Sequence, residues 1–219
     1  MRNAGLALSL LVLGFAPRNV VAGASSGASV VRLTVSVFND AGASSSVMSQ
    51  ARNRATLILR RAGISLVWLD CGTPGNPPPN STCSDLSFPQ HLSVRLVSTA
   101  GRPSEDTFGQ TFQNAAGEGN YALVYFRVLA SSGVTESVHA GDLLGFVIAH
   151  ELGHLLLGRD SHSATGLMAP VWQAGEVRLA SRGLLFFNKD QQERIRLRCL
   201  AAQAALKKAA SPPLAGSGK

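Results

Sequence analysis

The sequence has few aromatic residues: Phe, Trp and Tyr make up 6% of its 219 residues, with only two Trp and two Tyr. A net charge of +7 attracts polyanions, but the basic residues are scattered and no aromatic residues alternate with them. This lack of a combined basic and aromatic pattern argues against nucleic-acid binding. We therefore expect no nucleic acid as a partner, and only unspecific attraction to acidic surfaces or polymers.

Long hydrophobic runs are also scarce. The first apolar run, Leu6 to Phe15, is much shorter than the about 20 residues that span a bilayer. It follows Arg2 and leads to small residues that end at Ala24, an order typical of a secretory signal rather than of a membrane anchor. We expect residues 1–24 to be a signal peptide, the mature protein to be secreted or periplasmic, and no stable membrane insertion to remain after cleavage.

Cysteine is rare too, with three residues in the chain. Cys71 and Cys83 flank a segment of Gly, Pro and Asn residues that favours neither helix nor strand. A disulfide between them would close this loop, in agreement with export to an oxidising compartment. Cys199 would then be left over, although the sequence does not exclude that it pairs with either of the other two instead.

The most informative segment is the pentapeptide HELGH, which runs from His150 to His154. On a helix, four residues turn the chain by about 400°, so the two imidazoles emerge within about 40° of each other. Two nitrogens one turn apart can bind one Zn²⁺ ion, and Glu151 is placed to act as general base on a water that the metal activates. The apolar neighbours predict a buried helix with Asp142 as its N-cap and Gly158 as its stop.

Downstream of this helix the sequence continues with His162-Ser163 and, a few residues later, with Leu167-Met168-Ala169-Pro170. In this order the sequence resembles the metzincin zinc metalloproteases, whose pattern HExxHxxGxxH is followed by a methionine turn. The matrixin branch is the most similar. The resemblance implies four site residues: the zinc ligands His150 and His154, the general base Glu151 and the turn methionine Met168.

The spacing differs from the family pattern, in which the glycine lies seven and the third histidine ten residues after the first histidine. Here Gly158 lies eight and His162 twelve residues after His150. Either the turn is wider and His162 completes the site, or Asp160, at the strict position, is the third ligand. Zinc accepts both imidazole nitrogen and carboxylate oxygen. We favour His162, because the residues after it remain in step with the family pattern.

A third interpretation is a gluzincin-type peptidase, in which a glutamate from a separate downstream helix completes the site. Glu176 and Glu193 are the candidates. Glu176 follows Ala174-Gly175, a poor helix interior, and Glu193 lies in a charged run typical of a solvated helix face. Both observations count against this interpretation.

The order of the predicted elements also resembles a metzincin catalytic domain. Strands are expected at 30–38, 64–69, 91–97, 107–113 and 121–129, and helices at 46–61, around the zinc motif and at 188–208. The resemblance implies an α+β, zincin-like fold with a twisted mixed sheet, an active-site helix, a methionine turn and a C-terminal helix. This metalloprotease domain should comprise residues 25–208, followed by a disordered tail at 209–219 that is rich in Pro, Gly and Ser.

We predict a secreted zinc-dependent endopeptidase. The resemblance implies that its polypeptide substrate binds in extended form along an edge strand of the sheet, for which 107–113 is the candidate, although this segment could equally be an ordinary surface hairpin. Val171 and Trp172 could line the pocket for the residue after the scissile bond, or Trp172 could simply cover the core. Pro170 occupies the position at which some metzincins carry a tyrosine, so this chain lacks the tyrosine hydroxyl there.

Two other functions stay open. One is a non-catalytic zinc-site binding module of the cell envelope, against which Glu151 argues. The other is an enzyme acting on a non-peptide amide.

Overall fold

The structure, a computed structural model, describes residues 30–72, 81–98 and 107–210. The predicted signal peptide, residues 1–24, lies outside these residues, and so does the predicted tail except for its first two residues. Those two, Ala209 and Ala210, are the end of the last helix. The C-terminal helix is therefore slightly longer than the sequence predicts.

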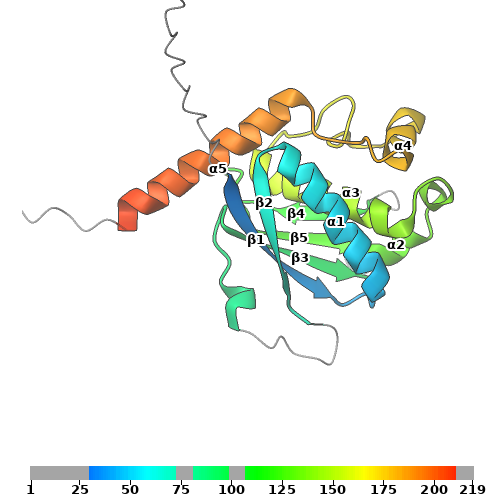
Figure 1. Ribbon diagram of the computed structural model, residues 1–219, viewed down its shortest axis with the longest axis horizontal. Helices are drawn as coiled ribbons and strands as arrows, with labels where there is room; N and C mark the ends of the chain where they lie inside the picture. Colours follow the sequence, from blue (N-terminus) through cyan, green and yellow to red (C-terminus); the bar gives the residue numbers. More distant parts are fainter. Residues whose placement is uncertain (1–29, 73–80, 99–106, 211–219) are drawn as a thin grey trace, which may run out of the picture.

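The chain forms strands and helices in the predicted order, with short helices added between them (Figure 1). The elements are β1 (Val31–Asn39), α1 (Ser45–Arg61), β2 (Ile64–Asp70), η1 (Ser81–Ser84), β3 (His91–Val97), β4 (Gly109–Phe112), β5 (Tyr121–Tyr125), α2 (Phe126–Ala130), η2 (Gly133–Glu136), α3 (Ala140–Leu157), α4 (Ala174–Ser181) and α5 (Lys189–Ala210). For β1, α1, β2, β3, β4 and α5 the predicted and observed ends agree to within two residues.

The sheet is mixed, as predicted, and its strand order is β2-β1-β3-β5-β4. The first four strands in this order are parallel, whereas β4 runs antiparallel to β5 and forms one edge. The predicted edge strand is confirmed, because β4 lies within 107–113. Together with the helices, this mixed sheet confirms the α+β class.

The predicted central strand at 121–129 is wrong in two respects. β5 ends at Tyr125 and lies next to the edge strand, so the central strand is β3. From Phe126 the chain forms the short helix α2 instead of continuing the strand. A short apolar run fits a buried strand and a buried helix equally well, so the periodicity alone could not locate this boundary.

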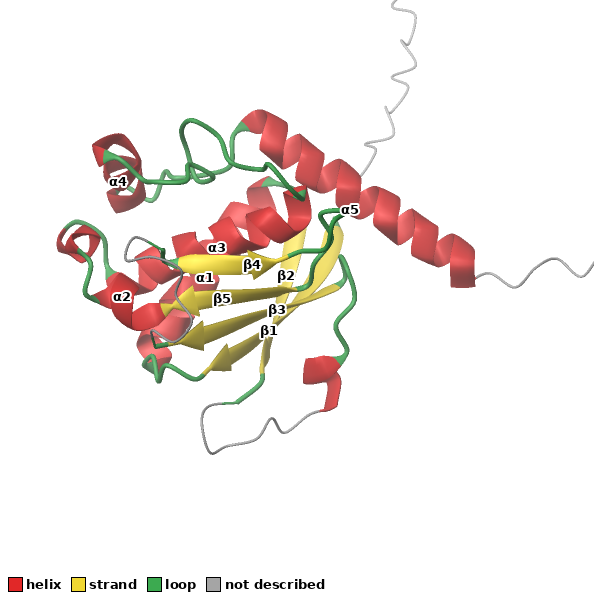
Figure 2. Cartoon of the chain, turned by 180° about the vertical axis from the view of Figure 1, so that it is seen from behind, coloured by secondary structure: helices red, strands yellow, loops and turns green. Residues whose placement is uncertain are grey.

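Helices α1 and α3 pack against each other on one face of the sheet, and Figure 2 shows the sheet from the opposite side. Leu33, Val94 and Val124 of the sheet and Ile58 and Ile148 of the helices are fully buried in one core cluster. By length and composition α3 could cross a membrane, but most of it is buried inside the protein, as in the core helix of a globular domain. This burial holds the HELGH segment in a fixed position against the sheet.

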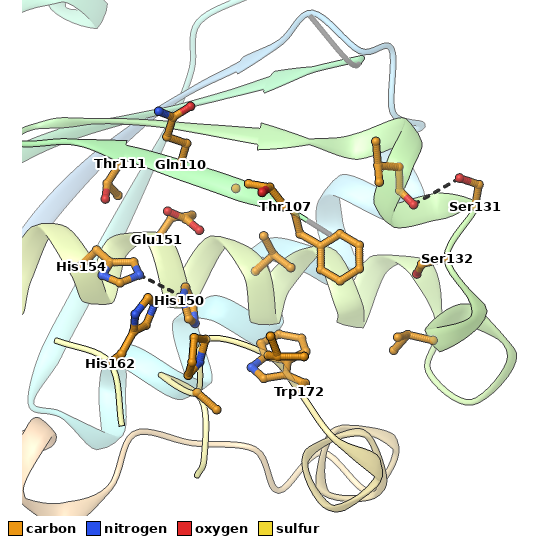
Figure 3. A pocket seen from close by; sticks show the side chains of 18 residues that line it. Thr107, Gln110, Thr111, Ser131, Ser132, His150, Glu151, His154, His162 and Trp172 are labelled. Carbon is orange, nitrogen blue, oxygen red and sulfur yellow. Dashed lines mark hydrogen bonds between the residues drawn. The ribbon is translucent and has the colours of Figure 1, made fainter. Parts of the chain in front are cut away.

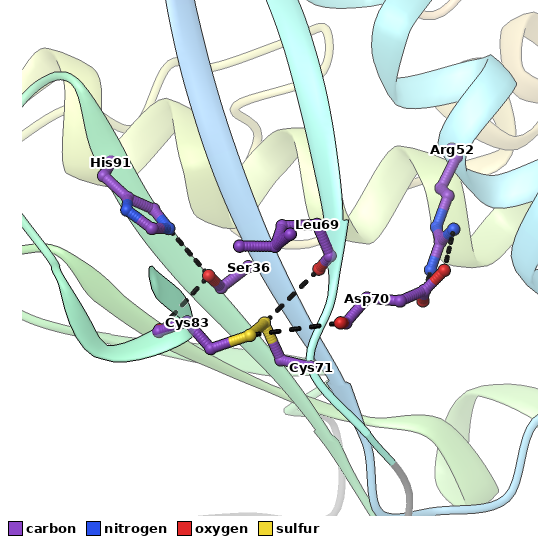
Figure 4. Close-up of a disulfide and its surroundings, with 7 residues drawn as sticks. All are labelled: Ser36, Arg52, Leu69, Asp70, Cys71, Cys83 and His91. Atoms are coloured by element: carbon purple, nitrogen blue, oxygen red, sulfur yellow. Dashed lines mark hydrogen bonds and ion pairs between the residues drawn. A yellow bond between two sulfur atoms is a disulfide. The ribbon is translucent and has the colours of Figure 1, made fainter. Parts of the chain in front are cut away.

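The predicted disulfide between Cys71 and Cys83 is present, and both cysteines are buried (Figure 4). The Ser36 hydroxyl of β1 donates to the Cys83 carbonyl (3.2 Å), and its oxygen lies 2.7 Å from Nε2 of His91 on β3. The bridge and these contacts attach η1 to the sheet. Cys199 is a buried free thiol, so the alternative pairings do not occur.

Replacing both bridge cysteines by serine should lower the free energy of unfolding by about 3 kcal/mol, because the denatured chain is no longer constrained by a loop of this size. Urea unfolding of Cys71→Ser/Cys83→Ser beside the parent protein measures the difference. The parent protein in a reducing buffer is the matched control and should unfold at the midpoint of the double variant. Equal midpoints for the oxidised parent and the double variant would contradict a stabilising role of the bridge.

Candidate metal centre

The HELGH segment lies on α3, whose ends are set by neighbouring residues. The helix ends at Leu157, and Gly158 stops it with a φ of 86° and a ψ of −161°, an extended conformation with positive φ that is essentially restricted to glycine. Its start differs from the prediction: the N-cap position is His139, and Asp142 lies in the first turn, where it accepts a hydrogen bond from Arg54 Nε (2.9 Å). The prediction was wrong because an acidic residue suits the first turn as well as the cap, and the ion pair with α1 is a tertiary contact.

Three histidines converge on one side of α3 (Figure 3). One nitrogen from each lies within 4.8 Å of the others, and the Nε2 atoms of His150 and His154 are 3.0 Å apart. His162 reaches the same point from the turn after the helix, with its ring centroid 4.7 Å from that of His154 and 5.6 Å from that of His150. Zinc–nitrogen bonds of about 2.0–2.1 Å in a tetrahedron place the nitrogens about 3.3 Å apart, so this donor set fits a metal ion of that size.

Hydrogen bonds behind two of the rings leave their Nε2 atoms facing the centre of the group. His150 Nδ1 lies 2.7 Å from the Leu167 carbonyl, which can only accept, so Nδ1 carries the proton and Nε2 the lone pair. His154 Nδ1 lies 2.7 Å from the Ser161 hydroxyl, which can accept in the same way. Burial lowers the pKa of His150 to about 4 and that of His154 to about 3. Both rings are therefore neutral at pH 7, the form that binds metal ions.

The two candidates for the third ligand lie in different places relative to the other histidines. Asp160 is exposed and lies outside the histidine group, to which His162 belongs. The φ of Asp160 is 53°, in the left-handed region that aspartate adopts more readily than most residues. The longer turn between His154 and His162 therefore brings the histidine, rather than the aspartate, next to α3.

The candidates for a gluzincin-type ligand also lie outside the histidine group. Glu176 is buried at the start of α4, a helix that the sequence did not predict, and its carboxylate accepts from the backbone N–H groups of Gly166 (3.3 Å) and Gln173 (3.2 Å). The Ala-Gly pair lies in the first turn of α4, where this carboxylate caps the helix and offsets the weak propensity of glycine. Glu193 forms an ion pair within α5, as expected for a solvated face.

Met168 lies in the predicted turn and is fully buried against α3. A Cβ atom at Gly153 would lie 2.6 Å from its Sδ, so the turn packs on the helix where the helix has no side chain. The neighbouring Leu167 carbonyl contacts both His150 Nδ1 and the Trp172 indole N–H, which donates to it over 3.1 Å. The methionine turn thus orients the first imidazole as well as supporting the helix.

A cavity of about 780 Å³ opens beside the histidines, and residues of β4 and of the methionine turn line it (Figure 3). Glu151 lines this cavity although its side chain is almost fully buried, and burial raises its pKa to about 8. Val171 and Trp172, the two residues predicted to line a substrate pocket, also line it. Trp172 packs edge-on against Phe146 of the core as well, with 6.3 Å between the ring centroids. Trp172 therefore both lines the cavity and covers part of the core.

A buried side chain from α5 forms hydrogen bonds to the turn between α3 and Met168. Gln191 donates from Nε2 to the Ser161 carbonyl (3.4 Å) and to the Ser163 hydroxyl (3.1 Å). Since Ser161 also contacts His154, α5 supports one of the three imidazoles through the turn. Sequence reasoning missed this role, because a single glutamine near the start of a polar helix carries no signal of burial.

The C-terminal end of α3 is held by two further side chains that the sequence did not single out. Gln113 donates to the carbonyl of His154 (2.6 Å), and Arg198 of α5 donates to the carbonyl of Leu156 (3.2 Å). Arg198 also donates to the Gly117 carbonyl between β4 and β5 (3.0 Å). The Leu156 carbonyl is one of those that a helix leaves without an intrahelical partner at its end, whereas the His154 carbonyl also accepts from the Gly158 N–H (2.9 Å). The two donors come from distant parts of the chain, so no local pattern could have revealed them.

Ser161→Ala should weaken zinc binding about 10–100-fold, because the variant no longer fixes the orientation and tautomer of His154. Competition with a chelator of known affinity at pH 7 measures the dissociation constant of zinc. Ser181→Ala is the matched control, since it removes an exposed hydroxyl on α4, and it should bind zinc as the parent does. An unchanged dissociation constant in Ser161→Ala would mean that the hydroxyl does not orient the ring.

No family model and no curated protein matches this chain. Among solved structures it is similar to metalloproteinase-II from Bacteroides fragilis, with 13% identity and a TM-score of 0.48 over 78% of this chain and 54% of that chain. The chain thus spans about half the length of that structure. It is also similar to archaemetzincin from Methanopyrus kandleri, with 14% identity and a TM-score of 0.49 over 80% of this chain and 98% of that one.

Proposed function

We propose that this chain is a zinc-dependent endopeptidase of the metzincin type. The observation that carries the proposal is the placement of three imidazoles and one carboxylate at the same cavity. His150, His154 and His162 converge there, and Glu151 lines the cavity beside them. Three protein ligands leave one position of a tetrahedral zinc ion for water or substrate, which is the arrangement of catalytic rather than of structural zinc sites.

The proposed reaction divides the chemistry between the metal and Glu151. His150, His154 and His162 would hold the zinc ion, which when bound would supply Lewis acidity towards water and the peptide carbonyl. Glu151 accepts a proton from the attacking water on its carboxylate and returns it to the nitrogen of the leaving amine. Burial raises the pKa of Glu151 to about 8 in the absence of metal. A zinc ion on the neighbouring histidines would lower this pKa again, because a nearby cation favours the ionised carboxylate, the form that accepts a proton.

The edge strand supports a polypeptide substrate bound in extended form. The Phe108 carbonyl accepts from the Tyr125 N–H of β5 (2.9 Å), so alternate residues from 108 onward direct their backbone groups towards β5. The backbone N–H and C=O groups of Gly109 and Thr111 then point to the outer edge, and both residues line the cavity. An extended peptide can pair with this edge as an additional strand and so lie along the cavity that contains the histidines.

Two observations count against the alternative functions. A module that only binds through zinc has no need of a buried carboxylate beside the metal ligands, yet Glu151 occupies that place. A gluzincin-type site needs a glutamate ligand, whereas Glu176 caps α4 and Glu193 lies exposed on α5. A metzincin-type site accounts both for the three histidines and for Glu151 beside them.

We further propose that the protein is secreted or periplasmic, with residues 1–24 as its signal peptide. The disulfide between Cys71 and Cys83 supports export, because such bonds form and persist in oxidising compartments. The proposal includes no nucleic-acid partner and no membrane insertion of the mature chain.

Glu151→Gln should lower kcat for peptide hydrolysis about 10²–10⁴-fold, because the amide cannot accept the proton, while zinc stays bound in a one-to-one ratio. The assay follows cleavage of casein and of a peptide library beside that of small non-peptide amides. Glu193→Gln, a change on the exposed face of α5, is the matched control and should cleave at the parental rate. Full activity of Glu151→Gln would contradict the mechanism, and cleavage of non-peptide amides alone would contradict the substrate class.

A further inference from the structure

We infer that Gly109 is a positioning residue for Glu151. Because this position of β4 has no side chain, the Glu151 carboxylate can lie between the edge strand and α3. The inference rests on the proposed function, in which Glu151 is the general base. It assigns a role to a residue of the sheet that the zinc motif does not contain.

The space beside Gly109 is already filled by the glutamate. A Cβ atom at Gly109 would lie 2.4 Å from Oε1, 2.6 Å from Cδ and 2.7 Å from Cγ of Glu151. Real Cβ atoms essentially never have contacts below 3.0 Å, and these three atoms are the nearest heavy atoms. The methyl group of an alanine would therefore collide with Glu151, the proposed base, before it met any other side chain.

The requirement for glycine at this position is spatial rather than conformational. Gly109 is not among the described glycines with positive φ, and it pairs with Val124 of β5 in regular antiparallel register. Alanine can therefore adopt the same backbone conformation. The strand can stay in place when the methyl group is added.

The carboxylate is the part of this contact that can move. β4 is held by its pairing with β5, and α3 is buried along most of its length. The Glu151 side chain, in contrast, lines the cavity and can move into it by changing rotamers, which takes Cγ as well as the carboxylate away from the methyl group. We therefore expect Gly109→Ala to preserve the fold and the three histidines while it displaces the Glu151 carboxylate.

Gly109→Ala tests the inference, and Gly175→Ala is the matched control, because a Cβ atom at Gly175 would meet nothing within 4 Å. We expect Gly109→Ala to bind zinc in the parental ratio and to unfold at the parental midpoint. Its kcat should fall about 100-fold, a loss that a misplacement of about 1 Å at a reacting centre can cause, and its KM should stay within about twofold. A crystal structure of the zinc-loaded variant should show the carboxylate displaced and the histidines unmoved.

The double variant Gly109→Ala/Glu151→Ala separates positioning from other roles of the glycine. If Gly109 acts only through Glu151, the double variant keeps the residual kcat of Glu151→Ala, because the added methyl group then fills vacated space. Additive losses in the double variant, or a parental kcat in Gly109→Ala, would overturn the inference.

Failure of the inference and failure of the proposed function are distinguishable. If the parent protein cleaves no peptide, the proposed function is wrong, and the crystal structures of the parent and of Gly109→Ala decide the inference alone. A displaced Glu151 carboxylate in Gly109→Ala then supports the positioning role, and an unmoved one overturns it.

Discussion

The hydrogen bond between His150 Nδ1 and the Leu167 carbonyl is the contact on which most of the site depends. It joins the helix that carries the motif to the methionine turn, and it leaves the lone pair of His150 Nε2 directed at the other histidines. The bond requires the turn to lie directly against α3. Met168 meets this requirement by packing on Gly153, and Trp172 by donating to the same carbonyl. Support of the helix and orientation of the imidazole are thus one structural feature.

The wider turn after α3 is a variation that the rest of the fold accommodates. Gly158 stops the helix, Asp160 adopts a left-handed conformation, and Ser161 returns to contact His154. Gln191 of α5 then holds the end of the turn through Ser161 and Ser163. Because α5 packs on α3, the turn is clamped between two helices, and two additional residues do not displace His162 from the other two histidines.

Local patterns in the sequence predicted those strands and helices whose apolar residues recur with the period of the element. The alternation in β3 located His91–Val97 without error, and the histidine spacing located the pair on α3. Helix α4 gave no such signal, because it begins with an Ala-Gly pair and its N-cap is a glutamine rather than one of the usual capping residues. The place of Asp142 in the first turn of α3 depends on the ion pair with Arg54, a contact between distant segments. The errors thus lie where the local pattern is ambiguous or where a contact between distant segments decides the structure.

The surroundings of the site were harder to predict than its central residues, because contacts between distant segments form them. The motif and its downstream histidine follow from spacing, whereas Ser161, Gln191 and Gly109 become informative only after the chain has folded. Zinc content of purified His162→Ala and Asp160→Ala tests the central claim, a three-histidine zinc site, most directly. The account predicts loss of stoichiometric zinc in the histidine variant and one zinc ion per chain in the aspartate variant. Loss of zinc in the aspartate variant alone would contradict it.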